Sequence, residues 1–300
     1  MTAAGQEPTS ASTGVVLVNP SSGPGPSPVE EVREAFAGHR VMECAADELE
    51  ETAERAVDDG PGFVAVAGGD GSIRAVASLL AGTGTPMVPV PTGTRNHFAR
   101  ELGIDTVAAA AAAAGGQRRA VDLAEVNGER FVNNSSIGFY ASLVRERDGH
   151  ERPWPAAVAN VTAAWAQARK GHRFRVEVGG RRHRAWLVFI GNGCYGEGLG
   201  DLIHRDRLDA GLLDVRVLRA DAPLARTRTV VSLLFGRLAE SPLLVQREEA
   251  ETVVALGRSS VEVALDGEVV LLRPPLRYRC LPGALTVLVP PATEGGRAGC

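Results

Sequence analysis

The chain has 300 residues, which is enough for two ordinary domains, and 44% of them are hydrophobic and 23% are charged. This composition excludes a globally disordered chain, and the net charge of −4 argues against a general nucleic-acid binder. The four cysteines lie too far apart for a zinc cluster and are typical of a reducing compartment. No signal peptide and no apolar run of ~20 residues is visible, so we expect a cytoplasmic protein whose contact with a membrane is peripheral.

The amino-terminal part begins with a polar tail, a strand and two helix starts. Residues 1–13 are small and polar, which is typical of a disordered tail. A buried strand is predicted over 14–18, and the turn-rich loop 19–23 follows it. Ser27–Glu30 has the pattern of a capping box with proline at the first helical position, and Asp47–Glu50 has the acidic version of that cap. Both patterns predict that a helix begins there.

Strands, loops and helices then alternate. A second buried strand is predicted over 63–67, followed by the loop Gly68–Ser72 and a helix over 73–80. A third strand over 87–90 runs into the loop 91–96. This alternation predicts a doubly wound parallel sheet, in which ligands bind at the loops past the carboxyl ends of the strands. Both glycine-containing loops are predicted to lie at such ends.

The chain after residue 120 has a different residue pattern. Strand-like runs dominate it, and two helices are predicted to interrupt them, at 156–169 and 224–238. We therefore predict an α/β domain over 14–120, a β-rich, sandwich-like domain over 121–290 and a short tail over 291–300. The predicted strands of the second domain are 130–135, 173–178, 185–190, 212–218, 260–265, 276–279 and 284–289.

The loop Gly68-Gly69-Asp70-Gly71-Ser72 is the first candidate site. Its glycines let backbone N–H groups approach an anion, and a helix that begins there adds partial positive charge. An acidic residue in a phosphate loop repels phosphate unless a cation or a proton-transfer role justifies it, and a nucleotide site with Mg²⁺ would justify Asp70. A tight turn with an Asx hydrogen bond from Asp70 explains the loop alone equally well.

The loop that begins at Pro91 is the second candidate site. Gly93 permits close backbone approach, and Thr94 and Asn96 are short polar side chains near a helix start. An ordinary helix N-cap also suits each of these residues. The pairing with the first loop, one strand earlier, favours the functional interpretation.

Together the two loops resemble the signature of the diacylglycerol kinase catalytic family, which includes bacterial lipid kinases and sphingosine kinases. The resemblance runs in order from about residue 14 to residue 290. Several motifs in the right order are more specific than either loop alone. The further segments that carry it are Val121–Leu123, Phe131–Gly138, Gly191–Gly193, Leu208–Asp214, Asp266–Glu268 and Leu281–Leu285.

The resemblance implies a two-domain lipid kinase that transfers the γ-phosphoryl group of ATP, with Mg²⁺, to a lipid hydroxyl. A diacylglycerol-like acceptor is the first expectation. The first domain would bind ATP, and the second would bind a membrane lipid reached by peripheral contact. Whether the protein forms a homodimer stays an open question.

The resemblance also implies roles for particular residues. It makes Glu268 the general base and Asp70 a catalytic residue that organises the Mg²⁺ of the nucleotide. Asp266-Gly267 is a hairpin-turn signal, so Glu268 is predicted to begin a strand. Without the resemblance, a solvated charge at a strand edge is the preferred explanation of Glu268. The implied nucleotide contacts are Asn19, Gly68, Gly69, Gly71, Ser72, Thr94 and Asn96.

The chain departs from the family pattern at several positions. Arg74 and Ala75 stand where members often have Asn-Glu, and His97 stands where an Asp is frequent. Ala210 stands where some members have the Asp of a structural Mg²⁺ site, which leaves the adjacent Asp209 as the candidate ligand. Because of these departures, a catalytically impaired nucleotide- or lipid-binding protein stays an alternative interpretation. Because of the GGDG loop, an enzyme similar to NAD kinase stays a second alternative.

Two further patterns have plain explanations. Gly191–Gly196 is a literal GxGxxG after an apolar strand, but a dinucleotide site needs a helix next and the following residues are a poor helix start. We interpret it as a loop near the acceptor lipid. The basic clusters at 169–173 and 181–184 are interpreted as solvated charges, with weak attraction to anionic lipid headgroups as the alternative.

Overall fold

The computed structural model describes residues 13–23, 25–138, 173–178, 180–196, 205–221 and 241–291, together with positions 225 and 228. The chain forms two compact units. Unit 1 runs to Ala120 and includes the chain again from Leu285, and unit 2 comprises Val121–Ala284. The sequence assigns residues up to 290 to the second domain. The residues from Leu285 on belong with unit 1 instead, because Val287 pairs with Met87 in the sheet of that unit.

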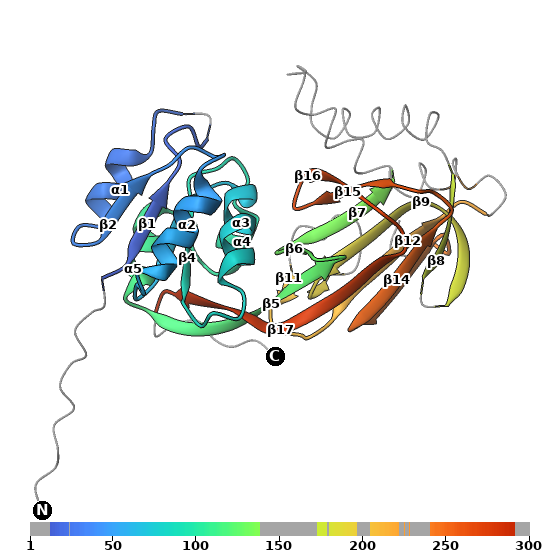
Figure 1. The fold of residues 1–300 in the computed structure, drawn as a ribbon. Helices are drawn as coiled ribbons and strands as arrows, with labels where there is room; N and C mark the ends of the chain where they lie inside the picture. Colours follow the sequence, from blue (N-terminus) through green and yellow to red (C-terminus); the bar gives the residue numbers. More distant parts are fainter. Residues whose placement is uncertain are drawn as a thin grey trace, which may run out of the picture. The chain divides into compact units, whose positions relative to one another are not determined.

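Unit 1 is built on a parallel sheet with the strand order β2-β1-β3-β4-β17 (Figure 1). Each neighbouring pair in this order is parallel. β1 and β3 are buried along their whole length, as expected of strands covered on both faces. The partly exposed β2 has no clear strand pattern and is not predicted from the sequence. The strands are β1 (Val15–Val18), β2 (Arg40–Glu43), β3 (Val64–Gly68), β4 (Met87–Pro91) and the end of β17 (Leu276–Val289).

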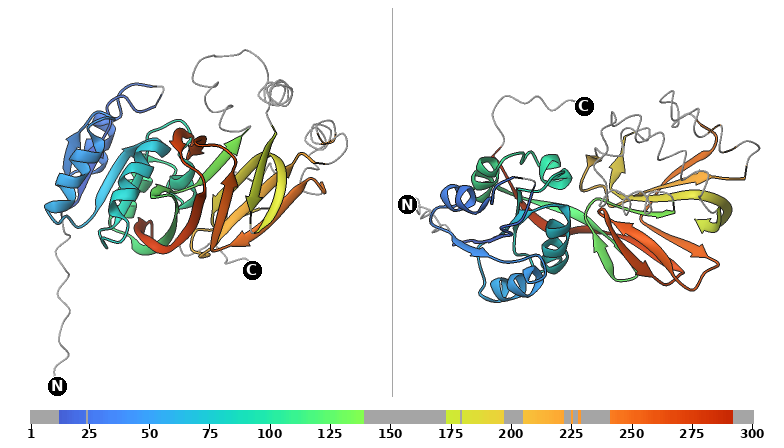
Figure 2. Two further views of the ribbon diagram at one scale, coloured as in Figure 1. Left: turned by 45° about the vertical axis from the view of Figure 1, so that its right-hand side comes forward. Right: turned by 90° about the horizontal axis from the view of Figure 1, so that it is seen from above.

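Helices cover both faces of this sheet (Figure 2). α2 packs against α3, and α1 packs against α5. This arrangement confirms the predicted doubly wound α/β fold, with the loops at the carboxyl ends of β1, β3 and β4 along one edge. The helices are α1 (Val29–Ala35), α2 (Leu49–Asp58), α3 (Asp70–Leu80), α4 (His97–Glu101) and α5 (Val107–Ala114).

Both predicted capping patterns are wrong in detail. The N-cap of α1 is Pro28 and that of α2 is Glu48, and neither side chain makes a capping hydrogen bond. Ser27 and Asp47 therefore lie one position too early for their oxygens to accept from the first free N–H groups. Acidic residues in the first turn of each helix still lie near its positive end, where they stabilise it.

Unit 2 is β-rich, and its described strand pairs are antiparallel. The order β16-β15-β7-β9-β8-β14-β17 forms the main path, and β12 joins β9 to β13. A buried aliphatic core that includes Ile137, Ile190, Val215 and Val263 holds these strands together. The strands introduced here are β5 (Gln117–Val126), β6 (Glu129–Phe131), β7 (Asn134–Gly138), β8 (Phe174–Val178), β9 (Arg181–Asn192), β10 (Cys194–Tyr195), β11 (Arg205–Arg207), β12 (Leu213–Arg219), β13 (Leu244–Glu249), β14 (Glu251–Leu256), β15 (Val261–Leu265) and β16 (Glu268–Leu272).

The predicted strands of this unit are mostly present, with two corrections. The run 130–135 is divided into β6 and β7, because the backbone between them binds the side chain of Asp266 instead of a neighbouring strand. The runs 276–279 and 284–289 are parts of the single strand β17. The mixed polar patterns of β13 and β14 gave no strand signal.

Several predictions lie outside the described residues. They include the helix 156–169, nearly all of the helix 224–238, most of both tails and most of the basic cluster 169–173. Within the described part of the chain, no helix is both long enough and apolar enough to cross a bilayer.

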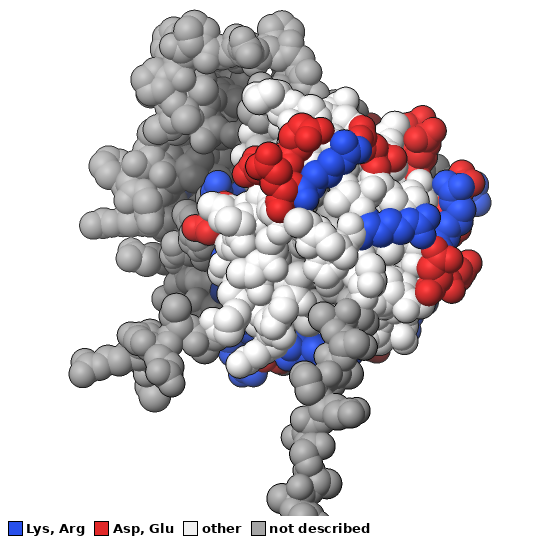
Figure 3. Space-filling view, turned by 90° about the vertical axis from the view of Figure 1, so that its left-hand side faces the viewer, with Lys and Arg blue, Asp and Glu red and all other residues white. Residues whose placement is uncertain are grey.

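Charges of both signs are interspersed on the face of unit 1 that Figure 3 presents. The ion pairs of this unit include Arg33 with Glu30 and Glu43, and Arg40 with Asp59. All of these side chains are largely exposed, so the pairs contribute little to the free energy of unfolding.

Candidate active site

The first glycine loop lies where β3 ends and α3 begins. A Cβ on Gly68 would lie 2.5 Å from the Cβ of Ser72, so the close packing of these two residues requires glycine. Gly69 is extended and forms the N-cap of α3, and Asp70 and Gly71 lie in the first turn of this 11-residue helix. The free N–H groups of that turn therefore point toward the carboxyl edge of the sheet, where an anion can accept from them.

The carboxylate of Asp70 is incompletely satisfied. Its Oδ1 atom is buried and has no hydrogen-bond partner among the described residues. The Asx turn considered above therefore does not form at this oxygen. A buried carboxylate oxygen without a partner is destabilising, and Mg²⁺ takes carboxylate oxygens together with phosphate oxygens and water. The residues present thus fit a phosphate group that carries Mg²⁺.

The second glycine loop contacts the first through its backbone. A Cβ on Gly93 would lie 2.4 Å from the Cα of Gly69, so no other residue fits at this contact. The side chain of Asn96 accepts from the Gly93 N–H at 3.0 Å and donates to the Gly93 carbonyl at 2.8 Å. Asn96 has a left-handed φ of 52° and makes no side-chain cap to α4, so it shapes the loop instead of capping the helix. Thr94 is exposed in the same loop.

A third loop, after β1, joins the other two. The Asn19 side chain accepts from the N–H of Ser21 at 2.9 Å, and the hydroxyls of Ser22 and Thr92 are 2.7 Å apart. Gly23 has a φ of 85°, and a Cβ there would lie 2.4 Å from the carbonyl oxygen of Thr92. The nucleotide residues predicted from the resemblance therefore lie on three loops that gather at one edge of the sheet. Their roles stay predictions.

Glu268 lies on unit 2, directly after the turn of the β15–β16 hairpin. Leu265 and Glu268 are paired, and Asp266 and Gly267 between them have φ values of 49° and 96°. Two positive φ angles define the type of two-residue turn that fits the twist of a hairpin. The predicted turn and strand start are confirmed. The Glu268 side chain is exposed, and its role as a base stays a prediction.

Asp266 fixes this hairpin to the segment between β6 and β7. Its carboxylate accepts from three consecutive backbone N–H groups, those of Val132 at 2.7 Å, Asn133 at 2.8 Å and Asn134 at 2.9 Å. Its own N–H donates to the carbonyl of Asn134 at 2.9 Å. The sequence shows Asp266 only as a turn residue, because nothing in the pattern reveals partners more than 130 positions away.

The predicted ligand of a structural metal does not lie in a metal-binding arrangement. Asp209 is exposed, and Nε of Arg207 lies 3.4 Å from its carboxylate. The buried Asp122 instead accepts from the N–H groups of Gly211 at 2.6 Å and Gly283 at 2.8 Å. The described residues contain no group of three His, Cys, Asp or Glu that could hold a metal. We therefore derive no step from a structural metal, and the role of Asp209 stays a prediction.

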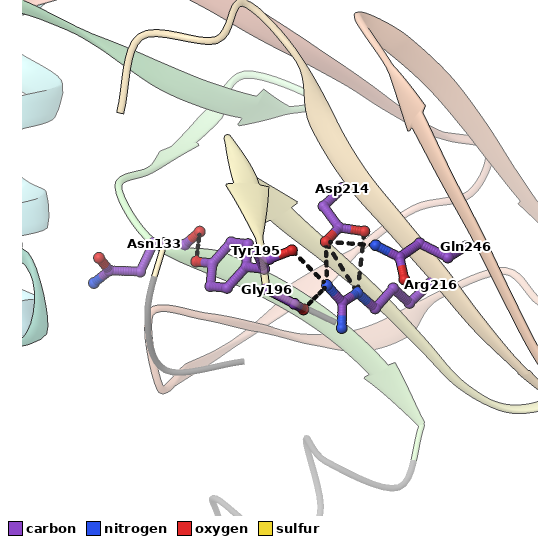
Figure 4. Close-up of polar contacts among 6 residues, drawn as sticks. All are labelled: Asn133, Tyr195, Gly196, Asp214, Arg216 and Gln246. Atoms are coloured by element: carbon purple, nitrogen blue, oxygen red, sulfur yellow. Dashed lines mark hydrogen bonds and ion pairs between the residues drawn. The ribbon is translucent and has the colours of Figure 1, made fainter. Parts of the chain in front are cut away.

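A buried ion pair lies on β12 (Figure 4). Arg216 and Asp214 are 1% and 0% exposed, and their closest atoms are 2.5 Å apart. Arg216 also donates to the carbonyls of Tyr195 at 3.1 Å and Gly196 at 2.8 Å, and Gln246 donates to Asp214 at 3.4 Å. Burial raises the pKa of Asp214, and the hydrogen bonds from Arg216 offset part of that shift.

The sequence pattern did not predict these buried charged residues. An Asp and an Arg two apart in an otherwise apolar strand share one face, and that spacing is the only signal that sequence offers for such a pair. Arg205 gives a weaker sequence signal, because its partners, two backbone carbonyls and the Asn133 side chain, are distant in the sequence. Gly191 and Asn192 end β9, and Cys194 and Tyr195 form β10 after Gly193, so the GxGxxG pattern is no dinucleotide loop. Its continuation at 197–204 lies outside the described residues.

Comparisons with known proteins agree with this architecture. The model of the diacylglycerol kinase catalytic domain matches residues 13–126, and that of the YegS C-terminal NAD kinase beta sandwich-like domain matches residues 142–289. A Pseudomonas aeruginosa protein named "Probable lipid kinase YegS-like" is 32% identical over 87% of this chain and 90% of its own length. An uncharacterized protein of Synechocystis is 27% identical over 81% of this chain, and the chain spans 58% of its length.

A solved structure supports the fold. The crystal structure of a candidate diacylglycerol kinase from Bacillus anthracis superposes with a TM-score of 0.70 over 92% of this chain and 96% of the other, at 21% identity. The chain belongs to the family of diacylglycerol kinase catalytic-domain proteins that includes the YegS-like lipid kinases. It is therefore an enzyme of the kinase class.

Proposed function

We propose that this protein transfers the γ-phosphoryl group of ATP to the hydroxyl group of a lipid, with a diacylglycerol-like acceptor as the first candidate. The observation that carries the proposal is the contact between Gly69 and Gly93 at the carboxyl edge of the sheet, beside the unpaired carboxylate oxygen of Asp70. Tight glycine loops, a helix amino end and a carboxylate are the parts that phosphate with Mg²⁺ requires.

The loops of unit 1 supply positioning and charge. The first N–H groups of α3 would donate to phosphate oxygens, and Asp70 would hold the Mg²⁺ that neutralises their charge. Mg²⁺ supplies stabilisation of the charge that develops on the transferred group. The Asn96 side chain keeps the second loop closed on Gly93, so the phosphate loops are ordered before the nucleotide binds.

Glu268 of unit 2 would accept the proton of the attacking hydroxyl. The carboxylate is exposed, so an acceptor can reach it, while the adjoining turn is fixed by three hydrogen bonds to Asp266. A base on a short, anchored hairpin holds its place better than one on a free loop. The expected contribution of such a base is roughly 10²–10⁴-fold in rate.

The strand that begins with Glu268 also supports a lipid acceptor. Val269 and Leu271 are 38% and 69% exposed on the edge strand β16. They share one face, and the described residues contain just one other large hydrophobic side chain with comparable exposure, Val253 on β14. Glu268 lies on the opposite face of the strand, because successive side chains alternate, and the exposed apolar side chains of the same edge strand suit an acceptor with acyl chains at a membrane surface.

Phosphoryl transfer from γ-labelled ATP tests the proposal. A panel of lipids in micelles with Mg²⁺ is incubated with the wild-type protein and with Glu268→Gln. We expect a labelled lipid with the wild type and a loss of at least about 100-fold with Glu268→Gln, because the amide cannot accept the proton. Label on NAD, added to the same panel, would contradict the lipid assignment, and ATP binding with no transfer to any acceptor would contradict the kinase activity.

A further inference from the structure

Arg205 is a buried cation of unit 2 that the proposed reaction does not use directly. It begins β11, is 8% exposed and lies opposite Tyr195 in the β10–β11 pair. One terminal nitrogen, Nη1, donates to the carbonyls of Val132 at 2.6 Å and Asn192 at 3.1 Å. The other, Nη2, donates to Oδ1 of Asn133 at 3.0 Å. Burying a guanidinium is costly, and two of its three bonds go to Val132 and Asn133, which suggests that this region must be held in place.

That region is the segment between β6 and β7, and Asp266 holds it by its other polar groups. Arg205 binds a carbonyl and a side-chain oxygen of the segment, while Asp266 binds three of its backbone N–H groups. The Tyr195 hydroxyl donates to the Asn133 carbonyl at 2.7 Å, as Figure 4 shows, and the Asn192 N–H donates to the same oxygen at 2.9 Å. These bonds replace the strand ladder that is missing there.

The position of Glu268 depends on this arrangement. Asp266 is in the two-residue turn that sets where β16 begins, and Glu268 is the first residue of β16. A shift of the 132–134 segment would therefore move Asp266 and, with it, the start of β16. We propose that Arg205 is a positioning residue for Glu268 and acts through Asn133 and Asp266; this inference rests on the proposed function.

Lysine cannot replace arginine in this role. The guanidinium is planar and donates from two terminal nitrogens in fixed directions, which lets it reach Val132, Asn192 and Asn133 together. An ammonium is a point charge and would release at least one of these acceptors. Arg205→Lys therefore keeps the charge and loosens the segment.

A double-mutant cycle tests the proposal. Four proteins are compared: the wild type, Arg205→Lys, Glu268→Gln and the double variant. We expect Arg205→Lys to lower kcat about tenfold, with the KM for ATP unchanged within about twofold, because misplacement of a reacting group lowers the rate of the chemical step. In the Glu268→Gln background the same change should alter kcat by less than about twofold, because no base is left to misplace.

Two further variants keep the test decisive. Asn133→Ala removes the Nη2 contact and leaves the backbone bonds, so it tests the same coupling if Arg205→Lys fails to fold; we expect a loss of about threefold that also disappears with Glu268→Gln. Arg216→Lys is the control, because Arg216 is another buried arginine of the same unit and it binds Asp214 and the carbonyls of Tyr195 and Gly196. Its loss should be the same factor in both backgrounds.

The outcomes separate the inference from the proposed function. Equal losses from Arg205→Lys in both backgrounds, or a wild-type kcat in Arg205→Lys, would overturn the positioning role while leaving the base intact. Wild-type turnover in Glu268→Gln alone would overturn the base assignment of the proposed function and the inference with it.

Discussion

The two units support their proposed roles with different kinds of groups. In unit 1 the candidate site is made of backbone: glycines at 69 and 93 bring two loops into contact, and a helix amino end supplies the donors. In unit 2 the support of Glu268 is made of charged side chains, above all the partly buried Asp266 and the buried Arg205. In the glycine loops, an added side-chain atom would collide with the facing backbone. In the side-chain network, the loss of one hydrogen bond would leave a polar group without its partner.

This difference predicts which changes damage each unit. An extra methyl group is the most damaging change in the glycine loops, because overpacking forces the backbone apart. The removal of one charge is the most damaging change in the network, because it leaves its partners buried and unsatisfied.

The largest effect is expected for Gly93→Ala. Its Cβ would lie 2.4 Å from the Cα of Gly69, so the two loops must separate, and we expect ATP binding to weaken by about 100-fold. Gly115→Ala is the control, since it has an ordinary φ and its nearest neighbour would be 3.9 Å away. Isothermal titration with ATP and Mg²⁺ measures both variants. Equal affinity in the two would contradict the backbone account of this site.

The next effect is expected for Asp266→Asn. The amide leaves three N–H groups with a poorer acceptor, so the free energy of unfolding should fall by about 2 kcal/mol and kcat should fall with it. Asp209→Asn changes an exposed carboxylate and should shift the urea midpoint little. If both variants unfold at the same urea concentration, the hairpin is not anchored by Asp266.

A smaller effect is expected at the exposed face of β16. Replacement of Val269 and Leu271 by serine should weaken association with lipid vesicles about tenfold, because apolar area leaves the membrane contact. Val253→Ser is the matched control, since Val253 is 40% exposed on β14. Co-sedimentation with vesicles gives the measurement. An equal loss of vesicle association in the control would show that any exposed valine has this effect, and it would contradict a specific role for β16.

The smallest effect is the pH dependence that Cys280 of unit 2 contributes to stability. Burial, with the carboxylate of Asp122 nearby, raises the pKa of the Cys280 thiol to about 12 from its usual value near 9.0. The unfolded thiol ionises first, so this contribution to stability is complete below pH 9 and is lost as the pH rises toward 12. At pH 9.5 the wild type should have lost about 1 kcal/mol of the contribution from Cys280 relative to pH 7.

Urea unfolding of the wild type and of Cys280→Ala at the two pH values measures this loss. The variant lacks the Cys280 thiol, so its stability should change less over the same range. The same pH dependence in both proteins would exclude Cys280 as its source.

The sequence predicted those features that depend on neighbouring residues. The buried strands β1 and β3, the glycine loops after β3 and β4, and the Asp266-Gly267 turn are all local patterns, and the structure has each of them. The helix caps failed because Ser27 and Asp47 are one position from the true caps, which is the usual uncertainty of a helix boundary.

The features that sequence missed depend on distant partners. Asp266 binds residues 132–134, and Arg205 binds Val132 and Asn192, so neither role leaves a trace in the local pattern. The two carbonyls that Arg205 reaches are backbone groups, which every residue carries. Only the folded strand order brings these groups together. For that reason the residues that support Glu268 could not be predicted, although its place at the start of a strand could.

The central claim is that unit 1 binds the nucleotide while Glu268 of unit 2 serves the chemical step. The most direct test measures ATP affinity and lipid phosphorylation in parallel for Gly93→Ala and Glu268→Gln. The account predicts that Gly93→Ala loses both, and that Glu268→Gln keeps wild-type ATP affinity while it loses at least about 100-fold in turnover. Weakened ATP binding in Glu268→Gln, or undiminished turnover in either variant, would contradict it.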